Sequence, residues 1–393
     1  MAKSAEPPLE LLAPAGDWDC VRAAVENGAD AVYFGLQTGF NARARAANFH
    51  LDDLPDLMRF LHRRGVKGYV TFNTLVFTEE LAAAEQHIRA MALADVDALL
   101  VQDLGAASLA RQVCPELSLH ASTQMTLTSA ECLELAMQLG IERVVLPREL
   151  SIQEIAKIHA QVEITLEAFV HGALCVAYSG QCLTSESLGG RSANRGQCAQ
   201  ACRLPYELIC DGQDVDLRDV KYLLSPQDLA AYALIPEMMA AGVRSFKIEG
   251  RLKTAEYVAN ITRHYRAAID AASAGSPVTF SPQQIEEMEL SFSRGFSPGW
   301  LQGCDHKMLV PGLSSAKRGV RLGEVVDVQG ARVAVRLTSR VAAGDGVVFE
   351  GDRVHDREQG GRVYEVWRGK KKVKSAVEGG IVDLTFGRND IDT

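Results

Sequence analysis

Four cysteines stand close together in the middle of the chain, at Cys175, Cys182, Cys198 and Cys202. Their spacing is C-x6-C-x15-C-x3-C. Four thiolates from one segment can form the ligand set of a structural zinc ion or of an iron–sulfur cluster of the [4Fe-4S] type. Zinc sites usually use C-x2-C pairs, which this segment lacks, so the spacing favours the cluster. Cys210 is a fifth thiol nearby and leaves the identity of the fourth ligand open.

Arginine and glycine fill the interval between the second and third cysteines. The run at residues 189–197 reads GGRSANRGQ and contains Arg191 and Arg195. Guanidinium groups and glycine-rich backbone amides both bind carboxylate and phosphate groups, so this run predicts an anion-binding loop. A cysteine nucleophile needs a histidine beside it, and only His171 near Cys175 offers such a pair. Neither H-E-x-x-H nor G-x-S-x-G occurs in the chain.

Polar side chains also gather where predicted strands end. His120, Glu249 and Lys247 are the candidate catalytic residues, with His120 and Glu249 as general acid and base. The other members of the set are candidate substrate-binding residues: Asn73, Gln124, Arg148, Glu167, His171, Arg191, Arg195 and Arg251. As a set they predict a pocket for a small anionic molecule. For any single residue, pairing with a neighbour in a polar barrel mouth is the alternative interpretation.

Eight β-rich runs are predicted to position these residues. They lie at residues 9–14, 31–36, 67–74, 98–103, 117–123, 143–149, 163–172 and 244–250. The runs between them indicate helices, such as one between Asp17 and Gly28 and another over 225–242, capped by Ser225 with Pro226 following. This alternation predicts an α/β fold, a (β/α)8 TIM-like barrel whose active site lies at the C-terminal ends of its strands. A doubly wound open sheet is the alternative, but no glycine-rich fingerprint follows the first strand.

The predicted barrel covers residues 9–275 and includes a cysteine-rich insertion at 173–210. Residues 276–313 indicate a linker with short helices. From 314 to 393 apolar and polar residues alternate between turns, which predicts a small antiparallel β-barrel or sandwich. A basic run in this part contains Lys370, Lys371, Lys372 and Lys374. It is either a solvated hairpin turn or a contact for RNA phosphates.

Composition and charge limit the classes of function. The net charge of −9 argues against a protein that coats nucleic acid through its overall field. From residue 311 onward, however, 15 Lys and Arg face 12 Asp and Glu. The chain begins without a signal-peptide pattern and has no apolar run long enough for a membrane span. We therefore expect a cytoplasmic protein with reduced thiols and no membrane partner.

Several runs resemble peptidase family U32. The signature residues are Glu167, Phe169, Gly172, Ala173, Cys175, Gly180, Cys182 and Ser185. The runs ELLAPAGD, ADAVYFG, VTFNT, HASTQ, VVLPREL and FKIEGR are similar to the rest of that family's barrel. LGGRSANRGQCAQACRLPY and YLLSPQDL are similar to the branch whose members hydroxylate ribosomal or transfer RNA.

This resemblance implies an iron–sulfur cluster on Cys175, Cys182, Cys198 and Cys202, with Ala201 where the family usually has proline. It also implies oxygen-independent hydroxylation of an RNA pyrimidine with prephenate as co-substrate. The chain is expected to be shorter at its C-terminus than the ribosomal-RNA members. A collagenase-like peptidase and a non-catalytic iron–sulfur or zinc scaffold are the alternative functions.

Overall fold

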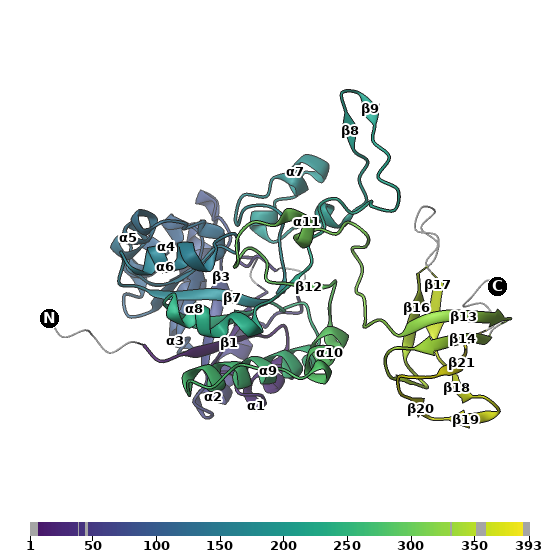
Figure 1. Ribbon diagram of the computed structural model, residues 1–393. Helices are drawn as coiled ribbons and strands as arrows, with labels where there is room; N and C mark the ends of the chain where they lie inside the picture. The colour runs from purple at the N-terminus through teal and green to yellow at the C-terminus, as the bar shows by residue number, and fades with distance from the viewer. Residues whose placement is uncertain (1–6, 38, 44–45, 331, 351–358, 388–393) are drawn as a thin grey trace. The chain divides into compact units, whose positions relative to one another are not determined.

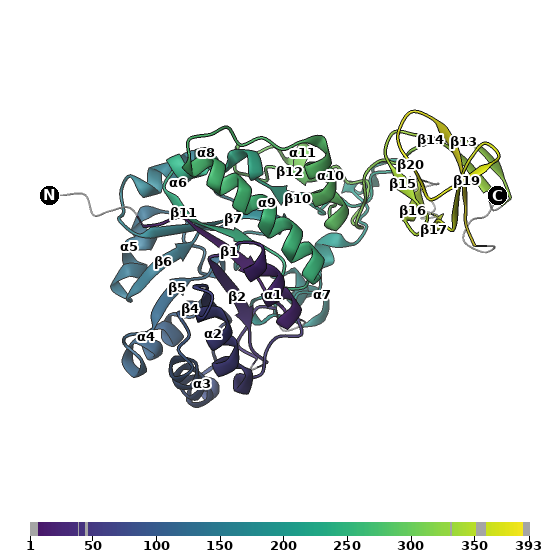
Figure 2. The ribbon, with the colours of Figure 1, turned by 90° about the horizontal axis from the view of Figure 1, so that it is seen from below.

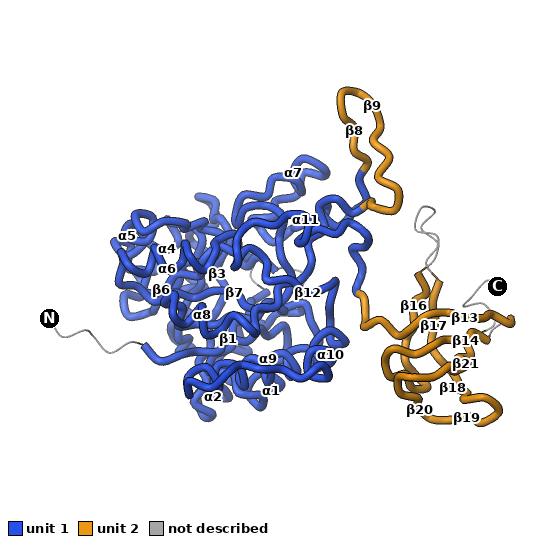
Figure 3. The backbone as a smooth tube through the Cα atoms, in the orientation of Figure 1, with its two compact units in different colours: residues 1–206, 222–317 blue, residues 207–221, 318–393 orange. Residues whose placement is uncertain are grey.

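The computed structural model of the protein describes residues 7–37, 39–43, 46–330, 332–350 and 359–387. The chain divides into two compact units (Figure 3). The first comprises residues 1–206 and 222–317, and the second comprises residues 207–221 and 318–393. The cysteines at 175–202 belong to the first unit.

Eight parallel strands form a closed barrel in the first unit (Figure 1). They are β1 (Glu10–Pro14), β2 (Ala31–Gly35), β3 (Lys67–Phe72), β4 (Ala98–Val101), β5 (Ser118–Ala121), β6 (Ile141–Val145), β7 (Thr165–Ala173) and β11 (Val243–Ile248). Closure comes from β11, which pairs with both β1 and β7. Every residue of β1, β2 and β4 is buried, as expected for strands covered on both faces. The predicted (β/α)8 barrel is confirmed.

Helices surround these strands (Figure 2). They are α1 (Trp18–Glu26), α2 (Leu54–His62), α3 (Leu81–Leu93), α4 (Leu104–Val113), α5 (Ala130–Gln138), α6 (Ile152–His159), α8 (Ile235–Ala240) and α9 (Ala255–Ser273). Asp17 caps α1 by accepting a hydrogen bond from the backbone N–H of Cys20 at 2.8 Å. Gly28 follows this helix with a φ of +92°, a conformation that favours glycine. None of the helices within the described residues has the length and apolar character that a membrane span requires.

The helix predicted over 225–242 is wrong in its first half. Residues Asp228–Ala230 form β10, which pairs antiparallel with the end of β7 and parallel with β12 (Phe296–Ser297). The Asp228 carboxylate accepts from Arg294 Nη1 at 3.0 Å and from the Arg294 backbone N–H at 2.9 Å. Tertiary pairing thus overrides a local sequence that resembles a capped helix, and the helix α8 begins only at Ile235.

The segment predicted as a linker, 276–313, is part of the first unit. It contains α10 (Pro282–Ser291), β12 and α11 (His306–Leu309). Asn260 of α9 donates to the backbone oxygen of Glu287 at 2.7 Å, and Met288 is buried. This segment therefore packs on the barrel.

The second unit contains a five-stranded antiparallel sheet in the order β13 (Gly323–Gln329), β14 (Arg332–Leu337), β21 (Ile381–Thr385), β18 (Glu365–Arg368) and β19 (Lys371–Val373). Smaller pairs join β15 (Val341–Ala342) to β20 (Ser375–Ala376), β16 (Gly346–Phe349) to β17 (Gln359–Arg362), and β8 (Ile209–Cys210) to β9 (Gln213–Asp214). Val335, Val366 and Leu384 lie in its apolar core. The antiparallel β-domain is observed, while residues 331, 351–358 and 388–393 of its predicted range lie outside the described residues.

Candidate active site

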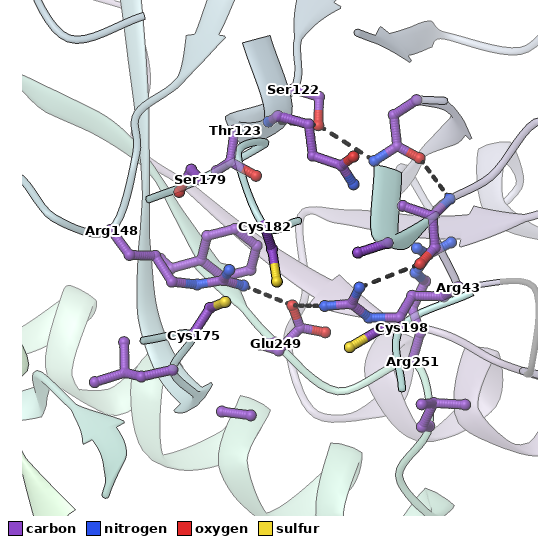
Figure 4. A pocket seen from close by; sticks show the side chains of 18 of the residues that line it. Arg43, Ser122, Thr123, Arg148, Cys175, Ser179, Cys182, Cys198, Glu249 and Arg251 are labelled. Carbon is purple, nitrogen blue, oxygen red and sulfur yellow. Dashed lines mark hydrogen bonds and ion pairs between the residues drawn. The ribbon is translucent and has the colours of Figure 1, made fainter. Parts of the chain in front are cut away.

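A pocket of about 400 Å³ lies at the C-terminal ends of the barrel strands (Figure 4). This volume falls in the range of small-molecule sites, about 300–1,000 Å³. Ten of the residues predicted for the site line it: Asn73, Gln124, Arg148, Cys175, Cys182, Cys198, Cys202, Lys247, Glu249 and Arg251. His120, Glu167, His171, Arg191 and Arg195 are not among its lining residues.

All four predicted metal-ligand cysteines line this pocket. Cys175 and Cys182 follow β7, and Cys198 and Cys202 follow α7 (Thr184–Gly189). Burial raises the pKa of Cys175 and of Cys202, and the negative charge of the neighbouring cysteines raises both further. Among the residues that the structure describes, no three His, Cys, Asp or Glu side chains are grouped so that they could hold a metal ion. The donor set itself, four thiols in one pocket, has the ligand chemistry of an iron–sulfur cluster.

Hydrogen bonds fasten the cysteine segment to the barrel. Ser179 donates to Glu149 from its backbone N–H at 3.0 Å and from its hydroxyl at 2.9 Å. Within the cysteine segment, Asn194 Nδ2 donates to the backbone oxygen of Gly180 at 2.8 Å. Gly180 has a φ of +74°, and a Cβ there would stand 2.2 Å from the Gln124 backbone oxygen. Only glycine at position 180, which lies between Cys175 and Cys182, therefore allows the backbone to come this close to Gln124.

Glu249 holds two arginines in the pocket wall (Figure 4). Its Oε2 accepts from Arg148 Nη2 at 2.6 Å and from Arg43 Nη2 at 3.3 Å. Burial raises the pKa of Glu249, but Arg43, Arg148, Arg251 and Lys247 together outweigh burial and lower the pKa to about 2. At neutral pH this side chain is therefore a carboxylate that positions guanidinium groups.

Positive charge is concentrated at the pocket. Seven cationic side chains line it, and Glu249 is the single acid among the described lining residues. The cations are Arg43, Arg148, Arg203, Lys247, Arg251, Lys253 and Arg294. The chain as a whole carries a net charge of −9, so this excess is local. Such a site stabilises bound anions.

Behind the pocket, a buried ion-pair network fills the barrel. Lys247 Nζ lies 2.8 Å from Glu167 Oε1, and Arg143 contacts both Glu10 and Glu167. The Ser245 hydroxyl donates to Glu10 at 2.9 Å. Glu167 is fully buried, so the structure places this predicted substrate-binding residue inside the barrel as the counter-ion of Lys247.

Two predicted histidines are also buried in the barrel wall. His120 packs edge-on against Tyr69 with ring centroids 4.9 Å apart, and burial holds its pKa well below the usual range. Burial lowers the pKa of His171 to about 3, and its Nδ1 lies 3.2 Å from the Tyr265 hydroxyl. His171 Nε2 has no hydrogen-bond partner in the structure, so His171 does not pair with Cys175. The structure therefore does not bring the predicted acid–base residue His120 to the pocket.

These neutral histidines make stability depend on pH. Because an unfolded histidine takes up a proton below about pH 6.5 and the folded ones do not, the unfolding free energy should fall as pH decreases from about 6.5 towards 3. Well below pH 6.5 each should contribute about 1.4 kcal/mol per pH unit. Urea unfolding at intervals between pH 5 and 7 checks this, and His171→Asn should flatten the slope. An unchanged slope in that variant would contradict the assignment.

The arginines between the cysteines lie outside the pocket lining. Arg195 Nη2 lies 2.6 Å from Glu80 Oε1, and Arg195 Nη1 donates to the backbone oxygen of Leu75 at 2.6 Å. Arg195 thus joins the cysteine segment to the loop after β3. Arg191 is exposed.

The second unit carries the remaining predicted residues. Cys210 is exposed on β8 and does not line the pocket. Lys370, Lys371, Lys372 and Lys374 are exposed at and after the turn between β18 and β19. Lys372 Nζ also lies 2.5 Å from Glu365 Oε1.

Four pocket cations were missed by sequence reasoning. Arg43 lies in the loop after β2, Arg203 follows the last cysteine, Lys253 follows β11, and Arg294 belongs to the predicted linker. Arg203 donates to the backbone oxygen of Leu174 at 2.9 Å, which ties the cysteine segment to the end of β7. The candidate site residues were chosen at the ends of the predicted strands, whereas these four cations lie in the segments that connect strands and helices. Their arginine and lysine character was the one available signal.

The fold and this site define a class: a (β/α)8 barrel with a polar pocket at the strand ends has the form of an enzyme. The family model described as peptidase family U32 matches residues 16–310. The chain belongs to this family.

The chain is similar both to proteins named for RNA hydroxylation and to a protein named as a collagenase. It is 43% identical over 350 residues to the 23S rRNA 5-hydroxycytidine C2501 synthase of Escherichia coli, covering 86% of this chain and 52% of that one. It is 36% identical over 301 residues to tRNA hydroxylation protein P1 of Bacillus subtilis, covering 75% and 71%. It is 37% identical over 313 residues to a collagenase of Porphyromonas gingivalis, covering 75% and 74%. The chain thus spans about half the length of the Escherichia coli synthase.

Proposed function

We propose that this protein is an iron–sulfur-dependent hydroxylase of RNA pyrimidines that uses prephenate and no oxygen. The observation that carries the proposal is the meeting of four cysteines and seven cations in one pocket at the strand ends. The names of the Escherichia coli and Bacillus subtilis relatives, both RNA-hydroxylation proteins, support the choice of substrate.

Cys175, Cys182, Cys198 and Cys202 would hold the cluster. Replacing a ring C–H by C–OH adds a hydroxyl oxygen to the pyrimidine and removes two electrons from it. In this proposal prephenate would give up its hydroxyl oxygen and accept the two electrons, so that its C–OH becomes C–H, and a cluster on these cysteines would supply one-electron redox capacity. Four thiolate ligands bring negative charge into the pocket, which the surrounding arginines offset. The cation excess therefore suits both the cluster and an anionic co-substrate.

One wall of the pocket suits a nucleobase taken out of its stack. Asn73 Nδ2 donates to the Ser122 hydroxyl at 3.2 Å, and Asn73 Oδ1 accepts from the Ala42 backbone N–H at 3.1 Å. Gln124 Oε1 is buried and has no hydrogen-bond partner in the structure. This free amide oxygen can accept from an N–H on the edge of a base. Tyr178 lines the pocket with 69% of its surface exposed, so its ring can stack on a base.

The opposite wall suits the carboxylates of prephenate. Glu249 contacts one nitrogen of Arg43 and one nitrogen of Arg148 and so holds both guanidinium groups at this wall. Guanidinium groups bind carboxylates well. Arg251 Nη1 donates to Thr71 Oγ1 at 2.7 Å, while its Nε is buried without a partner. In this proposal Arg148 and Arg251 bind the co-substrate, and Glu249 positions the arginines.

The second unit is proposed to contact RNA phosphates through Lys370, Lys371 and Lys374, whose side chains are exposed. A cytoplasmic location follows from this substrate. Both statements extend beyond the pocket and depend on RNA being the substrate.

Peptidase activity is the second candidate, because of the collagenase relative. The expectation that only His171 and Cys175 could form a thiol–imidazole pair is wrong, because Cys304 Sγ lies 3.1 Å from His306 Nε2 and Cys304 is exposed. This contact favours the peptidase candidate. This pair is not among the lining residues of the pocket. Gelatin hydrolysis that disappears in Cys304→Ser would support this candidate.

The proposed function is tested by gene deletion and complementation, with mass spectrometry of ribosomal and transfer RNA nucleosides. We expect one hydroxylated pyrimidine to disappear on deletion and to return with the wild-type gene. Identical nucleoside profiles in all strains would overturn the proposal. The same complementation is carried out with Lys247→Ala. If this variant restores the hydroxylated nucleoside fully and keeps its metal, the protein acts as a non-catalytic scaffold.

A further inference from the structure

Lys253 differs from the other cations of the pocket in its partners. Arg43 and Arg148 pair with Glu249, Lys247 pairs with Glu167, and Arg294 pairs with Asp228. Arg203 and Arg251 donate hydrogen bonds to oxygens of the barrel and its loops. Among the described residues, no carboxylate or hydrogen-bond acceptor contacts the Lys253 ammonium. It is the lining cation whose charge is left without a polar partner.

The surroundings of Lys253 are aromatic and positively charged. Its Nζ lies over the Phe292 ring, 2.7 Å from the ring centroid, and Arg294 Cζ lies 4.7 Å from the same centroid. Lys253, Phe292 and Arg294 all line the pocket. Burial and the charge of Arg294 lower the pKa of Lys253 to about 8, because Asp228 and Glu249 offset only part of their effect. The ammonium is nevertheless mostly protonated at neutral pH.

We propose that Lys253, with Arg294 beside it, binds an oxyanion of the substrate in this pocket. This inference rests on the proposed function, which supplies two sources of such a group: a carboxylate of the small co-substrate or a phosphate of the RNA. An anion here would meet a charged donor that the protein leaves unused and would offset the repulsion between two cations on one aromatic ring. Arg43 and Arg148 differ from Lys253 because Glu249 partly neutralises their charge.

The test measures binding of two probes, prephenate and a single-stranded RNA oligonucleotide, by calorimetry without turnover. Lys253→Gln removes the charge and Lys253→Arg keeps it. Lys157→Gln is the matched control, because Lys157 is exposed on α6 and does not line the pocket. Circular dichroism establishes that each variant is folded.

If Lys253 binds a carboxylate, Lys253→Gln weakens prephenate binding about tenfold, Lys253→Arg restores most of it, and RNA binding is unchanged. If it binds a phosphate, RNA affinity falls instead and its salt slope decreases by about 0.7. Equal binding of both probes by wild type and Lys253→Gln, or binding of neither probe by wild type, overturns the inference. Probe binding that depends on Lys253, without any RNA hydroxylation, would overturn the proposed function alone.

Discussion

Cys198→Ser should remove the proposed iron–sulfur cluster and, with it, the proposed RNA hydroxylation. Cys198 lines the pocket with Cys175, Cys182 and Cys202. A serine hydroxyl is a much poorer iron ligand than a thiolate, and each cysteine of a four-cysteine cluster holds one iron. We expect bound iron to fall at least tenfold from about four per chain, and hydroxylated nucleoside to fall to background.

Cys210→Ser is the matched control for this prediction. Cys210 lies in the same part of the sequence, but it is exposed on β8 and does not line the pocket. This variant should keep its iron and its visible absorption spectrum. Anaerobic purification, iron and sulfide analysis, and circular dichroism for folding compare the two variants. Iron loss in Cys210→Ser with retention in Cys198→Ser would show that the ligand assignment is wrong.

Glu249→Gln should lower the turnover number about a hundredfold and change prephenate binding much less. Glutamine keeps the shape of the side chain but removes the only acid among the described pocket-lining residues. Arg43 and Arg148 then lose the oxygen that holds them, and displaced groups at a reaction site can cost about 10²-fold in rate. The pocket also becomes more positive, and this gain in attraction for a carboxylate offsets the looser placement of Arg148, so prephenate affinity should change much less than turnover.

Steady-state kinetics with prephenate and RNA separate these two effects. Glu249→Asp keeps the charge and should recover part of the turnover, and Glu134→Gln, on the exposed face of α5, should behave as wild type. A parallel loss of turnover and prephenate affinity in folded Glu249→Gln would contradict the positioning role. It would indicate instead that Glu249 binds substrate directly.

The sequence was sufficient to predict the barrel because each strand is a short apolar run between helix signals. Closure of β7 on β11 follows once eight such units are counted. The cysteine pocket was also predictable, since Cys175 follows β7 by two residues and therefore lies at the strand end. The helix expected at 225–242 failed because β10 gains its stability from β7 and from Arg294, neither of which is local.

The histidines show why the acid–base assignments were less predictable. His120 and His171 lie near the ends of β5 and β7, but each side chain packs inside the protein against tyrosine. Position along a strand does not distinguish the last buried layer of a barrel from the residues just beyond it. Arg43 and Lys253 lie in loops, whose path to the pocket depends on tertiary structure.

The most direct test of the central claim is anaerobic turnover with purified components. Iron-loaded protein is mixed, without oxygen, with prephenate and RNA from cells that lack the gene, and the nucleosides are analysed by mass spectrometry. We expect a hydroxylated pyrimidine that requires prephenate and does not form with Cys198→Ser protein. Unchanged RNA with fully iron-loaded, folded protein, or equal hydroxylation by metal-free protein, would contradict it.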